Sequence, residues 1–281
     1  MADSADEGPV AFWRASARFS GLVTGFHRFR AQVSPGQRTS DVFFPGYPVI
    51  RFAVERPQPW SLRIGARQFD MPHASFTGPT NLAAWVEAGE GALIGMGLYA
   101  KGWARLFGGD ISAHANRVIP FSALDDDAED MRVALDDGAH PQIVLEAWLD
   151  RRLATARAFN PLIERLEEAI GGGTVTRIEA LAENLGLTMR QLAALTRQNF
   201  GFTPKMLLRR RRFLQALSRA LDAPPGESDA LLAAEGYWDR SHFLRDAHLF
   251  LGCSIREFRR RRGPLHALAM QKRAQVLGSA V

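Results

Sequence analysis

The sequence predicts an α+β protein, with a β-rich N-terminal half followed by an all-α half. Two observations carry this prediction. Short apolar runs separated by Gly- and Pro-containing turns fill the first 120 residues, whereas helical periodicity dominates the remainder. Charge divides in the same way: residues 1–150 hold 13 basic and 18 acidic residues (−5), and residues 151–281 hold 22 and 12 (+10). We therefore expect the second half to meet a polyanion.

The overall composition is that of a folded protein without membrane spans. Of 281 residues, 46% are hydrophobic, enough to bury a substantial core, yet no stretch approaches 18 consecutive apolar residues. The N-terminus carries Asp3, Asp6 and Glu7 where a signal peptide has basic and apolar residues. The single cysteine, Cys253, excludes an intramolecular disulfide. We expect a soluble cytoplasmic protein that does not associate with membranes.

We place a disordered tail at residues 1–9 and a β-rich sensor or dimerisation domain at residues 10–124. Turn formers separate its expected strands, which lie at residues 21–33, 39–44, 49–54, 61–64, 74–77 and 92–99. Many short strands at such spacing are typical of a β-sandwich or barrel.

Residues 125–173 are expected to form a helical connector. Helical runs cover residues 129–135, 141–158 and 161–170, and three glycines at 171–173 interrupt them. The acidic run 125–127 could suggest a metal site, but a solvated acidic cluster at a helix N-terminus explains it better.

The basic segment at residues 174–262 contains two copies of one helical motif. In the first, Thr176 and Glu179 can form a capping box, and Gly186 can end the helix. Thr188 with Gln191 can cap a second helix that runs to about residue 199. A helix, a tight turn and a second helix are the helix-turn-helix unit, whose second helix enters the DNA major groove.

The second copy starts near residue 231 and aligns with the first when Gly201 is matched to Gly252. In its second helix, Phe243, Ala247 and Phe250 share one face and should be buried. The opposite face carries Arg240, Ser241, Leu244, Arg245 and His248, and the equivalent face of the first copy carries Met189, Arg190, Ala193, Ala194 and Arg197. Arg donors can read guanine O6 and N7.

The basic segment resembles the AraC/XylS family of bacterial transcription regulators in Gly186–Leu192, Phe200–Lys205, Gly236–Phe243 with Arg245, and Gly252–Ser254 with Glu257–Arg259. The resemblance covers roughly residues 174–262 and implies a seven-helix domain that places two recognition helices in successive major grooves. It differs at position 194, where Ala194 replaces a common DNA-facing Arg, so we expect the second motif to carry more specificity. The expected DNA-binding residues are Arg190, Gln191, Arg197, Arg240, Ser241, His242, Arg245 and Arg259.

Two arginine runs complete the basic segment. Residues 209–212 and 259–262 are each expected to form a solvated or phosphate-proximal basic face, because neighbouring helical residues point in different directions. Residues 263–281 are expected to be a C-terminal tail.

Residues 10–124 more weakly resemble the cupin-like or related sensor domains of some family members. An apolar effector pocket is expected to include Phe43, Phe52, Trp60, Trp85 and Tyr99. His27, His73 and His114 lack metal-ligand spacing, so no metal or other cofactor is expected. The sequence also lacks a Gly-x-Ser-x-Gly motif, a Walker loop and a dinucleotide fingerprint.

The leading interpretation is therefore a sequence-specific DNA-binding transcription regulator controlled by a small-molecule effector, and not an enzyme. Expected partners are double-stranded DNA, the effector, RNA polymerase and a second copy of the chain. Two alternatives stay open: a small-molecule enzyme of a β-barrel class with an accessory helical module, and a nonspecific basic DNA binder.

Overall fold

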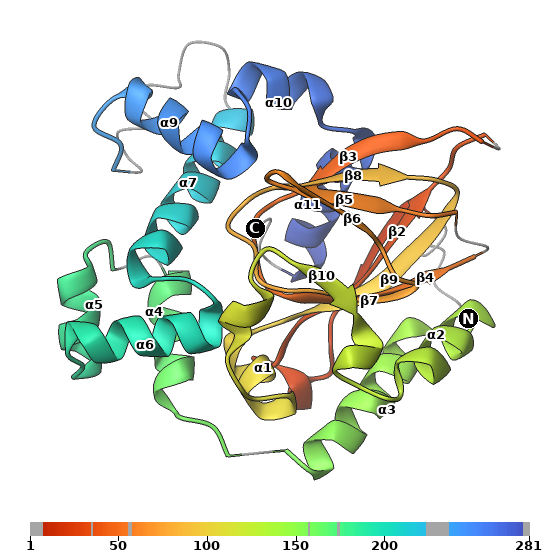
Figure 1. Cartoon of the computed structure of the whole chain (residues 1–281), viewed down its shortest axis with the longest axis horizontal. Coiled ribbons are helices and arrows are strands. Elements are labelled where there is room, and N and C mark those ends of the chain that lie inside the picture. The colour runs from red at the N-terminus through yellow and green to blue at the C-terminus, as the bar shows by residue number, and fades with distance from the viewer. Residues whose placement is uncertain are drawn as a thin grey trace.

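The computed structural model describes residues 8–34, 36–55, 58–156, 158–172, 175–222 and 236–277. The predicted β-rich N-terminal and helical C-terminal parts are both present (Figure 1). Most of the predicted disordered tail, residues 1–7, lies outside the described residues. Its last residue, Pro9, is held by a hydrogen bond from the Arg30 amide (2.8 Å). No helix in the described ranges is long and apolar enough to cross a membrane.

Two antiparallel sheets form the β-rich part. The larger has the strand order β1-β2-β9-β4-β7-β10, and the smaller has the order β3-β8-β5-β6. The strand bounds are β1 Val10–Trp13, β2 Val23–Ala31, β3 Thr39–Phe43, β4 Val49–Val54, β5 Ser61–Ile64, β6 Arg67–Asp70, β7 Ala74–Thr77, β8 Ala84–Ala88, β9 Gly91–Leu98 and β10 Val118–Pro120. All six predicted strands are found, whereas β1, β6, β8 and β10 were not predicted. The β8 strand is rich in Ala, which has low strand propensity.

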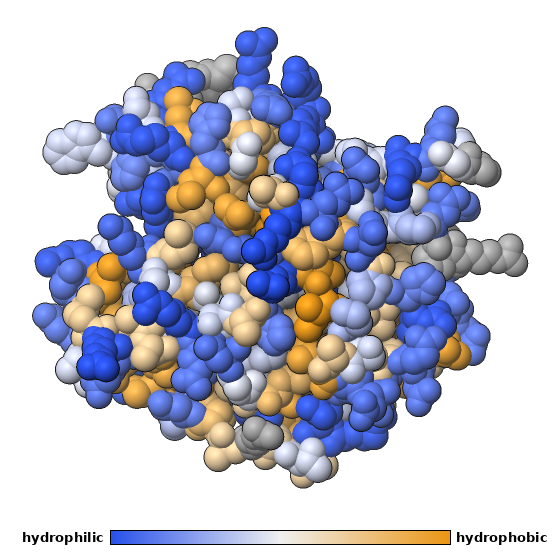
Figure 2. Space-filling model, viewed as in Figure 1, coloured by the Kyte–Doolittle hydropathy of each residue, from blue (hydrophilic) through white to orange (hydrophobic). Residues whose placement is uncertain are grey.

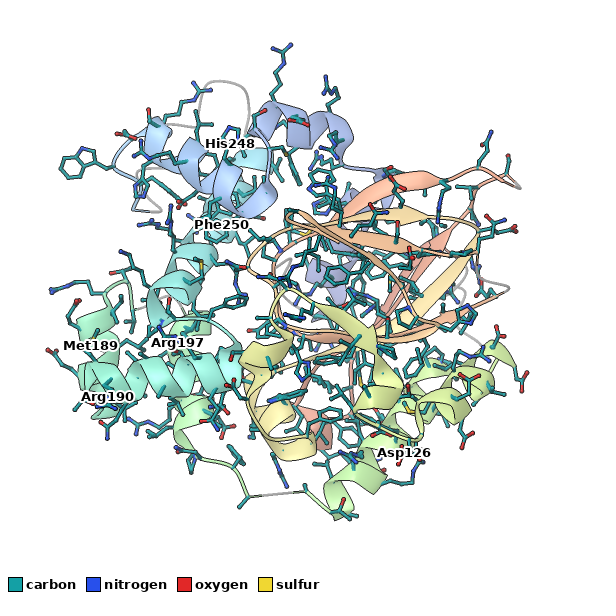
Figure 3. The ribbon with its side chains drawn as sticks, viewed as in Figure 1. Asp126, Met189, Arg190, Arg197, His248 and Phe250 are labelled. Atoms are coloured by element: carbon teal, nitrogen blue, oxygen red, sulfur yellow. The ribbon has the colours of Figure 1, made fainter. Side chains whose placement is uncertain are left out.

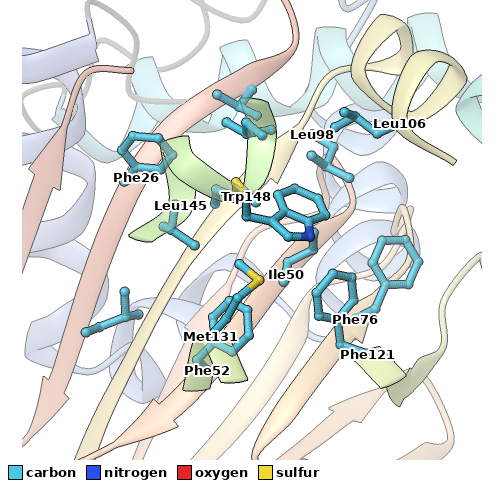
Figure 4. Close-up of a cluster of buried hydrophobic side chains, with 14 of the residues drawn as sticks. Phe26, Ile50, Phe52, Phe76, Leu98, Leu106, Phe121, Met131, Leu145 and Trp148 are labelled. Atoms are coloured by element: carbon cyan, nitrogen blue, oxygen red, sulfur yellow. The ribbon is translucent and has the colours of Figure 1, made fainter. Parts of the chain in front are cut away.

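Alternation along the strands gives the larger sheet two buried faces. In β4, Ile50 and Phe52 belong to a core on one face, and Ala53 belongs to a second core between the sheets. Helices α1 (Ala100–Leu106), α2 (Ala128–Asp136) and α3 (Pro141–Ala154) cover the first face. Figure 4 shows Phe52 and Phe76 of the sheet packed with Met131 and Trp148 of these helices.

The predicted connector divides between two cores. Helices α2 and α3 pack on the larger sheet, whereas α4 (Leu162–Gly172) packs with residues of α5 and α7. The expectation of a solvated acidic cluster is wrong for Asp125, which is buried. Its carboxylate accepts a hydrogen bond from the Trp148 indole (3.1 Å) and pairs with Arg152 (3.5 Å).

The basic segment is helical, as predicted, with α5 (Ile178–Leu185), α6 (Met189–Phe200), α7 (Pro204–Asp222), α9 (Arg240–Leu251) and α10 (Ile255–Arg261). The predicted capping box of Thr176 and Glu179 is wrong. The N-cap of α5 is Arg177, without a side-chain cap, because the helix starts one residue later than the pattern indicated. The expected start of the second motif, residues 231–235, lies outside the described residues.

The expected C-terminal tail instead contains helix α11 (Pro264–Leu277), which packs against β1, β2 and β3. Asp41 of β3 holds its first turn, because the carboxylate accepts hydrogen bonds from the Gly263 and His266 amides (3.1 and 3.0 Å). A carboxylate at a helix N-terminus satisfies amides that lack a helical partner. This partner is distant in the sequence, so local pattern did not indicate it.

Candidate DNA-binding surface and ligand cavity

Helix α6 is positioned by a turn that the sequence predicted correctly. Gly186 ends α5 with φ of 67°, a left-handed conformation that an L side chain adopts only with strain. Thr188 then caps α6 and exchanges hydrogen bonds with Gln191 in a capping box. Leu192 and Phe200 are buried, while Arg190 and Arg197 are exposed. The side-chain oxygen of Gln191, an expected DNA contact, accepts the Thr188 amide (2.9 Å) and so holds the helix start.

Helix α9 is built in the same way. The Asp239 carboxylate accepts the His242 amide (2.6 Å) at its N-terminus, and Gly252 ends it with φ of 71°. Phe243, Ala247 and Phe250 are buried as predicted. The expected DNA-facing side chains of Arg240, Ser241 and Arg245 are all exposed.

Helices α6 and α9 lie on the same side of the molecule, with α7 between them (Figure 1). Figure 3 shows Met189 and Arg190 at the outer end of α6 and His248 on the outer side of α9. Phe250 points the other way, and its ring stacks on Phe213 of α7 with 5.1 Å between centroids. The outer surface of α9 and α10 is mainly hydrophilic (Figure 2).

Besides Gln191, two further expected DNA contacts have partners within the protein. The half-buried ring of His242 lies 3.3 Å from a terminal nitrogen of Arg212 and packs against Tyr237. The Arg259 guanidinium donates a hydrogen bond to the Ala220 carbonyl (2.7 Å) in the last turn of α7. Arg259 therefore joins α10 to the C-terminal end of α7, where a cation is favoured.

The arginine run in α7 is not the basic face that the sequence indicated. Arg209 pairs with the buried carboxylate of Asp246 in α9 (2.6 Å), and Arg212 lies 3.6 Å from the same carboxylate. Tyr237 also donates a hydrogen bond to Asp246 (2.7 Å), and burial together with this carboxylate raises the pKa of Tyr237. This ion pair and hydrogen bond fix the position of α9 against α7.

The β-rich part contacts α9 directly. The indole of Trp85 donates a hydrogen bond to the Leu251 carbonyl (3.1 Å), and the Ala83 amide donates to the Phe250 carbonyl (2.7 Å). Arg261 of α10 lies over the Trp85 ring at 4.1 Å. Trp85, an expected effector contact, is thus part of the interface between the sandwich and the helical domain.

A cavity of about 340 Å³ is lined by residues of both sheets and of α4, α7 and α11. Two of the expected effector contacts, Phe43 and Trp60, line it. Phe52 belongs to the core on the opposite face of the larger sheet, and Tyr99 packs edge-on against the lining residue Tyr47 at 5.0 Å. The wall also includes the apolar residues Phe12, Phe29, Phe44, Val49, Val86, Leu207, Leu214, Leu265 and Met270.

Four arginines line this apolar wall: Arg51 from β4, Arg210 and Arg211 from α7, and Arg273 from α11. The sequence indicated only the two α7 residues, and it indicated them as part of the solvated or phosphate-proximal run 209–212. Burial lowers the pKa of Arg51 and of Arg210 to about 10, and also lowers that of Arg273. Burial and the charges of Arg51 and Arg273 lower the pKa of His27, which lines the same cavity. The lowered pKa values reflect positive charge held in an apolar, weakly solvated space.

Few negative groups offset this charge. Arg210 donates to the Thr80 carbonyl (2.6 Å), while Nε of Arg51 has no hydrogen-bond partner among the described residues. Among the residues that the structure describes, the one carboxylate that lines the cavity is that of Asp41, which accepts hydrogen bonds from the amides of Val42, Gly263 and His266. The cavity therefore has the electrostatic character of a site for an anion with an apolar body.

A pair of glycines makes room for these groups. The strand β9 reads Gly95-Met96-Gly97, and a Cβ atom on Gly95 would lie 2.1 Å from the Ile50 carbonyl oxygen and 3.1 Å from the Arg51 side chain. Gly97 lines the cavity itself. The alternating glycines of β9 were thus the sequence signal that another group approaches this strand closely. They did not indicate that this group is Arg51.

Comparison with known proteins supports the assignment of the helical region. A family model of a helix-turn-helix domain matches residues 181–261. Among curated proteins, none matches the sequence. The fold is similar to solved structures of ToxT from Vibrio cholerae, one at 9% identity (83% of this chain, 97% of that chain, TM-score 0.47) and an unsaturated fatty acid-bound form at 8% identity (83% and 98%, TM-score 0.44).

A further similar structure is the AraC-like transcriptional activator CuxR, at 14% identity over 75% of this chain and 88% of that chain, with a TM-score of 0.30. The matched range 181–261 contains both capped helices, α6 and α9, with their exposed arginine faces. Residues 181–261 are therefore a helix-turn-helix domain, as the sequence predicted.

Proposed function

We propose that the protein is a sequence-specific DNA-binding transcription regulator that responds to an anionic, largely apolar small molecule. The observation that carries the DNA-binding part is the pair of helices α6 and α9. Each is capped at both ends, is buried along one side, and presents exposed arginines along the other. Forked Arg donors on a helix that enters the major groove are the common readers of guanine.

Selection of bound duplexes from a random pool, at 150 mM salt, tests this part. We expect enrichment of one motif with two half-sites about one helical turn apart, since each recognition helix occupies one major groove. Arg245→Ala should reduce this enrichment, whereas Arg67→Ala should not, because Arg67 is exposed on β6, in the sandwich. Binding without enrichment would support the nonspecific binder, and no binding would leave the enzyme alternative.

The cavity supports the effector part of the proposal. Its position between the sandwich, α7 and α11 places a bound molecule against the helix that joins the two recognition helices. Its volume of about 340 Å³ falls within the range of small-molecule sites, roughly 300–1,000 Å³. Among the described residues, no carboxylate pairs with Arg51, Arg210 or Arg273. The carboxylate of a bound ligand could therefore pair with one of them.

Calorimetric titration with a long-chain monocarboxylate and with its methyl ester tests this part. The acid should bind and the ester should not, since only the acid supplies the negative charge. Arg51→Met should weaken binding of the acid, because it removes one of the lining arginines. Without ligand it should raise the melting temperature, because it removes a buried charge whose Nε is unsatisfied. Equal binding of acid and ester would contradict the assignment of an anion.

RNA polymerase and a second copy of the chain remain partners of this proposal, and sedimentation of the full chain with and without duplex tests the latter.

A further inference from the structure

Large apolar side chains that are well exposed are concentrated near the starts of the two recognition helices. Among the described residues, Val133, Ile143, Met189, Trp238 and Leu244 form this class, with exposed fractions of 42%, 70%, 48%, 95% and 36%. Met189 is the first residue of α6, Trp238 immediately precedes the N-cap of α9, and Leu244 lies in the first half of α9. Single exposed apolar residues are ordinary, but three at these helix starts call for a common cause.

The helical geometry places these side chains among the arginines. Leu244 lies one turn after Arg240 and next to Arg245, and the opposite side of the helix is buried through Phe243 and Ala247. On α6, Met189 and Arg190 stand together at the outer end of the helix (Figure 3). On each recognition helix, an exposed apolar side chain therefore lies beside exposed arginines.

The positive charge around these apolar side chains indicates which kind of partner binds them. A hydrophobic protein partner would have to bury Arg190, Arg240 and Arg245 without counter-charges, which is costly. Duplex DNA offers phosphates to the guanidinium groups and, in the major groove, one apolar feature beside the bases: the C5-methyl group of thymine. An apolar side chain between groove-facing arginines matches that feature.

We propose that Met189, Trp238 and Leu244 read thymine methyl groups, so that the binding site carries thymines beside the guanines contacted by the arginines. This inference rests on the proposed DNA-binding function and adds a second class of base contact to it. It assigns sequence selectivity to the first motif as well. There, Ala194 has no hydrogen-bonding side chain, but Met189 provides an apolar side chain.

The test replaces each thymine of the selected site with deoxyuridine, one at a time, and measures affinity by fluorescence anisotropy. Deoxyuridine keeps every hydrogen-bonding group and lacks only the methyl. With the unmodified protein, we expect about a fourfold loss at each contacted thymine, the value for uncovering about one methyl group. The loss should be the same at 50 and 200 mM salt, because no phosphate contact changes.

Variants then assign each thymine to a side chain. Met189→Ala, Trp238→Ala and Leu244→Ala should each remove the deoxyuridine effect at one position and leave it at the others. Ile143→Ala is the matched control, because Ile143 is an exposed apolar residue on α3, distant in sequence from both motifs, and its profile should equal that of the unmodified protein. Since all these side chains are exposed, melting temperatures should stay within about 2 °C.

The outcomes separate this inference from the proposed function. If no duplex is bound or enriched, the DNA-binding proposal fails. If a motif is enriched but contains no thymines at the half-sites, or if the three variants keep the deoxyuridine profile of the unmodified protein, DNA binding stands and methyl reading is wrong.

Discussion

Arg209 of α7 places its guanidinium 2.6 Å from the carboxylate of Asp246, which has no exposed surface in α9. Tyr237 donates to the second oxygen of this carboxylate at 2.7 Å. The pairing fixes the second recognition helix to the helix that leads from the first motif. It also explains why an arginine-rich run need not be a DNA-binding surface.

Asp246→Ala should destabilise the protein by about 3 kcal/mol or more, because it leaves Arg209 and Tyr237 without their buried acceptor. Chemical denaturation followed by circular dichroism measures this loss. Arg245→Ala, at the neighbouring exposed position, is the control and should change the free energy of unfolding by less than about 0.5 kcal/mol. Equal effects of the two variants would show that the buried pair contributes little.

Arg245→Ala should cost about 1–3 kcal/mol on the best site and much less on random DNA, the value of one bidentate contact with guanine. Position 194 is its exposed counterpart in α6, so Ala194→Arg should tighten or alter recognition in the other half-site. Competition binding with specific and random duplexes measures both. Equal losses for Arg245→Ala on the two duplexes would falsify this division of labour between the motifs.

Arg259→Ala should weaken binding to every duplex by a similar factor and make the salt dependence slightly shallower, as for the loss of one phosphate contact. The structure adds a second effect: without the hydrogen bond to the Ala220 carbonyl, the free energy of unfolding should fall by about 1 kcal/mol. Salt titrations and thermal denaturation separate the two effects. A loss of affinity confined to one sequence would mean that Arg259 reads bases.

Without ligand, the free energy of unfolding should decrease as the pH drops below about 6.5, the usual pKa of histidine. Burial and the nearby arginines lower the pKa of His27 in the folded protein, so in this range the unfolded chain takes up a proton that the folded chain does not. The unfolded state is therefore favoured by acid. His27→Gln should reduce the dependence between pH 7 and 5 in thermal denaturation but not remove it, because burial also lowers the pKa of His114 and of His266. Replacement of His73, which is exposed, serves as the control variant.

A bound anion in the cavity should reduce the same acid sensitivity, since negative charge near Arg51 and Arg273 raises the pKa of His27. Repeating the pH series with a saturating long-chain monocarboxylate checks this extension. An unchanged slope with bound ligand would place the anion away from His27.

Much of the fold and of the DNA-binding surface could be predicted because local chemistry determines it. The φ of 67° at Gly186, the capping box of Thr188 and Gln191, and the buried side of α9 all depend on residues within a few positions of one another. The same holds for the strands, whose alternating side chains and flanking turn residues are adjacent in the chain.

Only the tertiary structure decided which cations are exposed and which are buried. Arg190 and Arg210 are equally basic in the sequence, yet Arg190 faces outward and Arg210 lines a cavity beside Thr80, 130 residues earlier in the chain. The packing of α11 against Asp41, 225 residues before His266, is decided in the same way. Helical periodicity determines which side chains share a face, but the desolvation and hydrogen bonding of that face depend on the distant segment that packs against it.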